Sequence, residues 1–162
     1  MAFVFYEMSA LHSIWEDLLE DVSYGLFAIH SQLEDHSLAY SLNAACSFSL
    51  NRTSTDLELG NAAFFPVFYW NDELHFRVWT LFKNKGYGAL HLNGLDTGLF
   101  SDQSSEKRHY LIPEKKEVDY FLKVEGEVNA ASILEKLLKI PRLITAYHLE
   151  ASGLKSKHNL IY

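Results

Sequence analysis

The chain carries, at residues 64–82, the stretch FFPVFYWNDELHFRVWTLF. Its two halves, residues 64–70 and 73–82, are rich in aromatic and β-branched side chains, which favour strands. Asn71 and Asp72 stand between them and are typical of a tight hairpin turn. Pro66 has no amide to donate to a ladder, so we expect it at a sheet edge or a bulge. The stretch therefore predicts an antiparallel sheet.

The elements before this hairpin are predicted from periodicity and capping. Residues 10–22 place apolar side chains at three- and four-residue spacing and indicate an amphipathic helix. Residues 24–30 form a short apolar run, which is typical of a central strand. Ser31 followed by Glu34 resembles a capping box that would start a helix over 32–45, burying Leu38, Leu42 and Ala45. Two short strands, or one interrupted strand, are expected around 48–50 and 57–59.

The elements after the hairpin complete the prediction. The glycine-rich and polar stretch 86–106 indicates a long loop. Residues 108–112 and 118–124 suggest a second hairpin whose turn is 113–117. Asn129 opens a helix that Pro141 stops, and 143–149 is a final strand. With no repeat and no linker, residues 1–162 are expected to be one α+β domain, with a mainly antiparallel sheet and three helices gathered largely on one face.

Composition limits the classes of function. The chain has 162 residues, of which 48% are hydrophobic and 14% aromatic, and this supplies one core. The net charge of -7 disfavours a generic grip on nucleic acid, which needs a basic surface. Cys46 is the single cysteine, so neither an intrachain disulfide nor a cysteine-rich zinc site is expected. No secretory signal and no apolar run of ~20 residues is present, so we expect a cytoplasmic protein without a membrane partner.

One motif resembles a known family. Residues 112–120 read IPEKKEVDY, with Ile112, Pro113 and Glu114 followed after three residues by Val118, Asp119 and Tyr120. The chain is thus similar to the IPExxxVDY proteins, a small uncharacterised bacterial family. The similarity extends over 28–35, 38–40, 140–147 and 154–161, but not over the first twenty or so residues or about 86–107. It implies a shared fold and a bacterial cytosolic setting, and it implies no reaction.

Acidic residues and histidine supply the candidates for catalysis or metal binding. Glu114 and Asp119 lie on opposite arms of the predicted turn, where they would form a general acid and base pair or a metal site. The competing interpretation, which we favour, is that they accept backbone amide bonds and fix the turn. His30 and Glu34, with Asp35 and His36 beside them, resemble half of a metal shell, but no metalloenzyme motif is complete. We therefore expect no catalytic residue, no metal and no cofactor.

Basic residues near the carboxyl terminus supply the binding candidates, namely Arg142, Lys155, Lys157 and His158. They would form an anion or RNA patch, or a solvated tail, or a partner for the acidic helix over 10–22. The tail 154–162 either packs on its own domain or docks on a partner, and we favour docking.

The function predicted from these patterns is that of a small cytosolic binding or adaptor protein. It would act through a protein partner or as a homo-oligomer, without catalytic activity. The alternatives are an enzyme that uses Glu114 and Asp119 with His30 or Glu34, and an RNA- or ribosome-associated factor that uses the basic carboxyl terminus.

Overall fold

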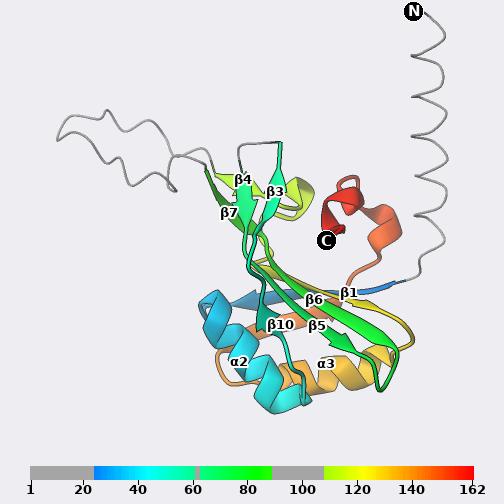
Figure 1. Cartoon of the computed structure of the whole chain (residues 1–162). Coiled ribbons are helices and arrows are strands. Elements are labelled where there is room, and N and C mark those ends of the chain that lie inside the picture. The colour runs from blue at the N-terminus through cyan, green and yellow to red at the C-terminus, as the bar shows by residue number, and fades with distance from the viewer. Residues whose placement is uncertain (1–23, 61–62, 89–107) are drawn as a thin grey trace, which may run out of the picture.

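A six-stranded antiparallel sheet forms the centre of the fold (Figure 1). The computed structural model describes residues 24–60, 63–88 and 108–162. The sheet has the order β10-β1-β9-β6-β5-β2. Its strands are β1 (Tyr24–Ser31), β2 (Asn51–Arg52), β5 (Val67–Asp72), β6 (Arg77–Lys83), β9 (Tyr120–Glu125) and β10 (Leu143–His148).

A smaller sheet of four strands has the order β3-β4-β7-β8. Its strands are β3 (Leu57–Leu59), β4 (Ala63–Phe65), β7 (Lys85–Gly88) and β8 (His109–Tyr110). Pro66 lies between β4 and β5, and its carbonyl accepts from the Lys83 amide at 3.2 Å. The expected edge position is wrong, because β4 and β5 each have a strand on both sides, and Pro66 is instead accommodated where the chain passes from one sheet to the other. The predicted loop 86–106 is partly wrong, because it begins as strand β7; its residues 89–106 lie outside the described part of the chain.

The described residues contain two α-helices, α2 (Asp35–Cys46) and α3 (Ala130–Leu138), and three short 3-10 helices, η2 (Pro113–Lys115), η3 (Ala151–Gly153) and η4 (Lys157–Leu160). The α+β class is confirmed, and the described residues hold two of the three expected helices. The predicted helix over 10–22 lies outside the described residues. Neither described helix is both long and apolar enough to cross a membrane.

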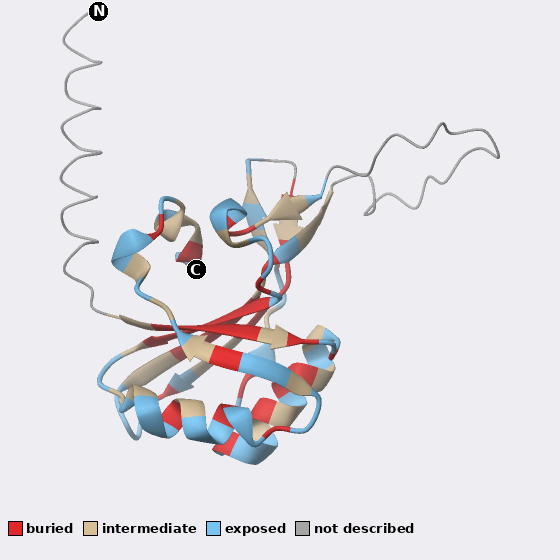
Figure 2. Ribbon diagram, turned by 180° about the vertical axis from the view of Figure 1, so that it is seen from behind, coloured by how far each residue is buried: buried red, intermediate tan, exposed pale blue. Residues whose placement is uncertain are grey.

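The large sheet separates two hydrophobic cores, because side chains alternate between its faces (Figure 2). On β1, Phe27 and Ile29 face the helices, whereas Leu26 and Ala28 face the small sheet and the carboxyl-terminal segment. Helices α2 and α3 thus cover one face, as predicted. Each fully buried large side chain contributes roughly 1.5 to 3 kcal/mol before chain entropy is subtracted.

The two α-helices begin in different ways. The capping box predicted at Ser31 and Glu34 is wrong, because Ser31 is still part of β1 and its Oγ accepts from the Leu33 amide at 3.1 Å. Helix α2 therefore starts later, after Glu34, and Glu34 makes no cap bond. It buries Leu38 and Leu42 as expected, but Ala39 and Cys46 in place of Ala45. Helix α3 is capped as predicted, since the Asn129 side chain accepts from the Ser132 amide.

Both predicted hairpins need correction. In the first, β5 runs through Asn71 to Asp72, and the turn is the longer segment 73–76. In the second, β8 and β9 do not pair with each other, because β8 pairs with β7 while β9 lies between β1 and β6. The signature turn consequently joins the two sheets instead of closing a hairpin.

Candidate protein-binding surface

We name the turn between β5 and β6, residues 73–76, the β5–β6 tip. Polar side chains within it and on the two residues that flank it hold it in place. Asp72, whose side chain is buried, accepts from the His75 amide at 3.3 Å. Its Oδ2 also lies 2.8 Å from His75 Nδ1. On the other arm, Arg77 Nε donates to the Glu127 carbonyl at 2.7 Å. The tip is therefore fixed on both sides.

The β5–β6 tip displays two large apolar side chains. Leu74 is 82% exposed and Phe76 is 89% exposed. Phe76 also has a φ of 54°, a left-handed conformation that a bulky residue rarely adopts. Gly126 supports this arrangement from the next strand end, since a Cβ at Gly126 would lie 2.7 Å from the Phe76 carbonyl oxygen. The backbone thus holds an aromatic ring in solvent at a conformational cost.

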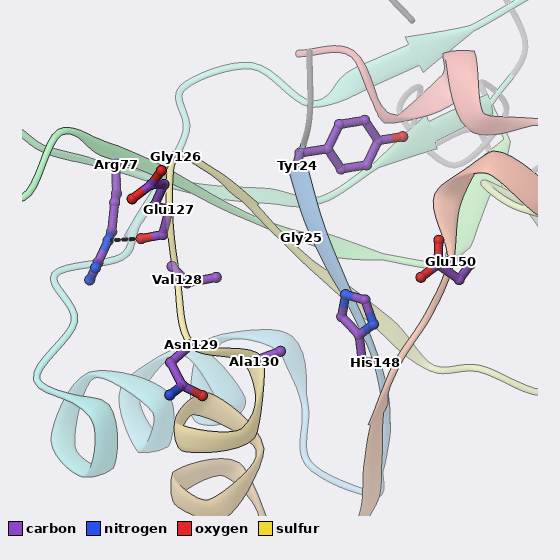
Figure 3. A pocket seen from close by; sticks show the side chains of 10 residues that line it. All are labelled: Tyr24, Gly25, Arg77, Gly126, Glu127, Val128, Asn129, Ala130, His148 and Glu150. Carbon is purple, nitrogen blue, oxygen red and sulfur yellow. Dashed lines mark hydrogen bonds between the residues drawn. The ribbon is translucent and has the colours of Figure 1, made fainter. Parts of the chain in front are cut away.

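A groove of about 910 Å³ begins beside the tip at Arg77 (Figure 3). Figure 3 shows Arg77 and Glu127 on one side, and His148 and Glu150 on the other. At the margin of the groove, the pKa of the Tyr24 phenol is raised, mainly by burial and to a smaller extent by the nearby Glu125 carboxylate. The groove is lined by Tyr24, Gly25, Arg77, Gly126, Glu127, Val128, Asn129, Ala130, His148 and Glu150.

The chemistry of this surface suits recognition of a protein. Among the described residues, no three of His, Cys, Asp and Glu gather where they would hold a metal ion. The groove mixes both signs of charge, and the tip supplies a leucine and a phenylalanine. Apolar anchors beside a polar, charged margin are the usual composition of a protein interface.

The two carboxylates of the predicted site, Glu114 and Asp119, bind different segments of the chain. Asp119 Oδ2 accepts from the Ser31 amide at 2.9 Å, which ties the signature turn to the end of β1. Glu114 accepts from the Ser156 amide at 2.8 Å and from the Ser156 hydroxyl at 3.0 Å, which ties the turn to the carboxyl-terminal segment. Desolvation acts to raise the pKa of Glu114, but the hydrogen bonds from Ser156 outweigh it, so its pKa is lowered. Each carboxylate binds backbone.

His30 and Glu34 are not brought together as a metal shell. His30 Nε2 lies 3.5 Å from the Tyr147 hydroxyl, and the two rings are 5.7 Å apart. Glu34 forms an ion pair with Lys83 at 3.6 Å. The Tyr120 hydroxyl donates to the Leu33 carbonyl at 2.7 Å, and its pKa is raised, first by burial. These contacts connect β1, β9 and β10 to the start of α2.

The four basic candidates lie in two places. Arg142 precedes β10 and lines a second hollow of about 540 Å³ with residues of α2, on the helix-covered face. Lys155, Lys157 and His158 belong to the carboxyl-terminal segment, which packs over the opposite face through Leu154 and Leu160. The preferred docking of the tail 154–162 on a partner is not what the structure shows, because the tail packs on its own domain.

Two features of the structure have weak sequence signals. Leu74 and Phe76 fall within the predicted strand 73–82, although two large apolar residues soon after Asn71-Asp72-Glu73 also fit an exposed turn. The second feature is Asn84. It is fully buried and holds the signature turn, and no sequence pattern distinguishes it from a loop asparagine.

Neither the family models nor the curated proteins nor the solved structures compared with the chain provide a match. The similarity to the IPExxxVDY proteins therefore stays a prediction that rests on the quoted residues alone.

Proposed function

We propose that this protein is a small cytoplasmic binding or adaptor protein, similar to the IPExxxVDY proteins, and that a protein partner binds its β5–β6 tip. The single observation that carries the proposal is Phe76. Its ring is 89% exposed and its backbone has a φ of 54°. Bulky residues in such conformations persist where the surrounding structure enforces them, and they concentrate at binding sites.

The surroundings of the tip support this role. Asp72 and the Arg77–Glu127 contact pre-order the turn, so a partner would find the two apolar side chains already in place. Pre-ordering reduces the entropy lost on binding. Aromatic residues with a charged margin are also the residues that dominate binding energy in protein interfaces. The groove beside Arg77 offers that margin.

The acid–base alternative receives no comparable support. Glu114 and Asp119 each accept from backbone amides of different segments, Ser156 and Ser31. Such bonds account for both carboxylates without chemistry. A binding role is therefore the proposal that uses an otherwise unexplained feature of the molecule.

The test is site-specific photo-crosslinking in a lysate of the source cells, with a benzophenone amino acid in place of Leu74. The matched control carries the same amino acid in place of Tyr40, which is 76% exposed on α2. We expect a discrete crosslinked protein from position 74 that disappears when Phe76→Ser is added, and none from position 40. Equal crosslinking from both positions, or none from position 74, would contradict the proposal.

A further inference from the structure

Strand β10 is the last strand of the large sheet among the described residues. It pairs with β1 on one side, and within the described residues no strand pairs with its other side (Figure 2). Ile144 is 62% exposed, and Thr145 and His148 are exposed as well. The opposite edge differs, because β2 is only two residues long and carries Arg52, two common protections against pairing. Edge β10 has six residues and no proline or lysine.

The hydrogen bonds of β10 show which of its backbone groups face outward. The Leu149 amide donates to the Leu26 carbonyl at 2.8 Å, so the backbone groups of Leu149 point toward β1. The Ile29 carbonyl accepts from the Asp119 amide at 3.2 Å, so the backbone groups of Ile29 point toward β9 and away from its register partner Ala146. Backbone direction alternates along an antiparallel ladder. The amides and carbonyls of Ala146 and His148 therefore point away from β1, toward the open side.

The charges next to this edge are self-complementary. Arg142 and Glu150 are both exposed and stand at equal distances along the chain from Ala146. Arg142 and Glu150 lie just beyond the two ends of β10 (Leu143–His148). If two antiparallel copies of β10 pair around Ala146, the start of one strand comes beside the end of the other, and Arg142 of one copy comes near Glu150 of the other. Other registers that use the outward backbone groups lose the pairing of opposite charges.

We propose that β10 pairs with β10 of a second copy of this chain, around a two-fold axis at Ala146, and joins the two large sheets into one. Because the interface is isologous, the Arg142–Glu150 pair occurs twice in each dimer. Ile144, 62% exposed on β10, adds apolar surface to the new ladder. Unpaired backbone groups of an open edge supply the main attraction.

The test is sedimentation velocity of the full chain over a range of concentrations, with three variants. Arg142→Glu and Glu150→Arg each place like charges opposite one another, and each should raise the dissociation constant of the dimer at least about tenfold. The double variant Arg142→Glu with Glu150→Arg exchanges the charges and should restore the parent dimer. Unchanged melting temperatures of the single variants, extrapolated to low protein concentration, confirm that the fold is intact.

Two results would overturn the proposal: a parent chain that stays monomeric at every concentration, or a dimer that the single charge reversals leave unchanged. Failure of the double variant to restore the dimer would reject the register centred on Ala146. The proposal does not depend on the β5–β6 tip; because Glu150 lines the groove beside the tip, crosslinking from position 74 is compared between the parent and Arg142→Glu, whose changed residue lies outside that groove. Crosslinking from position 74 and dimerisation therefore succeed or fail separately.

Discussion

At the scale of single residues, Asn84 is the residue that organises the signature turn. Its Oδ1 accepts from the Ile112 amide at 2.9 Å, and its Nδ2 donates to the Lys115 and Val118 carbonyls, both at 2.8 Å. Its backbone also binds the segment, accepting from Leu111 and donating to Asp119. One fully buried side chain thus satisfies polar groups along the whole turn, which would otherwise be buried without partners.

We expect Asn84→Ala to lower the free energy of unfolding by about 2 to 4 kcal/mol, because it leaves buried donors and acceptors without partners. Urea denaturation measures the change. Asn51→Ala is the matched control, since Asn51 is exposed and donates only to the nearby Ser49 carbonyl, and it should cost less than about 0.5 kcal/mol. Equal effects of the two substitutions would show that Asn84 does not hold the turn.

Glu114 gives a pH-dependent prediction. Its pKa is lowered from 4.5 in the folded protein, so its contribution to stability is present above about pH 4.5 and is lost as the pH falls through the folded pKa. Since the carboxylate is exposed, Glu114→Gln should cost only about 1 kcal/mol at pH 7. The difference between variant and parent should disappear in strong acid.

Urea denaturation at pH 7 and at about pH 3 tests this, with Glu117→Gln as the control because Glu117 is exposed on the same turn. A Glu114→Gln deficit that persists unchanged at the lower pH would mean that the loss comes from the shape of the side chain and not from its charge.

At the scale of elements, the β5–β6 tip is a strained turn between two regular strands. The register pairs Asp72 with Arg77, so residues 73–76 must reverse the chain in four positions. Phe76 takes the positive φ that glycine would take at lower cost. Arg77, which follows Phe76, is tied to the Glu127 carbonyl, and Gly126 leaves room for the Phe76 carbonyl oxygen.

Phe76→Gly should therefore leave the protein as stable or stabilise it by up to about 1 kcal/mol, because glycine relieves the left-handed strain and the exposed ring contributes little packing. Leu74→Gly is the control; it removes an equally exposed side chain, but no positive φ is recorded at Leu74, so it should be neutral or destabilising. Thermal unfolding compares the two. A clear loss of stability in Phe76→Gly would show that the ring serves the fold and not a partner.

The sequence predicts elements better than it predicts their junctions. Strand β1, helix α3 and strand β10 are close to expectation. A short apolar run predicts β1, and Asn129 and Pro141 bound α3 and leave β10 to follow it. The failures lie where a distant residue decides. Ser31 stays in β1 because Asp119 binds its amide, and β8 joins β7 instead of β9 because Asn84 holds Leu111. Neither contact has a local sequence signal.

At the scale of the whole molecule, the carboxyl-terminal segment closes the second core. The Asn159 side chain donates to the Leu111 carbonyl at 2.8 Å. Lys123, which points from β9 to this face, donates to the Leu160 carbonyl at 3.1 Å and forms an ion pair with Glu125 at 2.6 Å. Its ammonium also lies 5.0 Å from the centre of the Tyr24 ring. The segment thus supplies one of the partners that satisfy a buried lysine.

Leu160→Ala should consequently lower the free energy of unfolding by about 2 to 4 kcal/mol, the usual cost of a cavity at a buried leucine. Leu160 is 1% exposed, whereas its neighbour Ile161 is 49% exposed, so Ile161→Ala is the matched control and should cost less than about 1 kcal/mol. The loss at position 160 follows from the second core, because Leu160 packs with residues of β1 and β9 that belong to the large sheet. Urea denaturation followed by tryptophan fluorescence reports it, since Trp70 and Trp79 pack in the other core, on the opposite face of the large sheet. A single transition with a lower midpoint is the expected result.

Unchanged stability in Leu160→Ala would mean that the segment detaches from the domain in solution. The tail would then be available to dock on a partner, as the sequence analysis predicts.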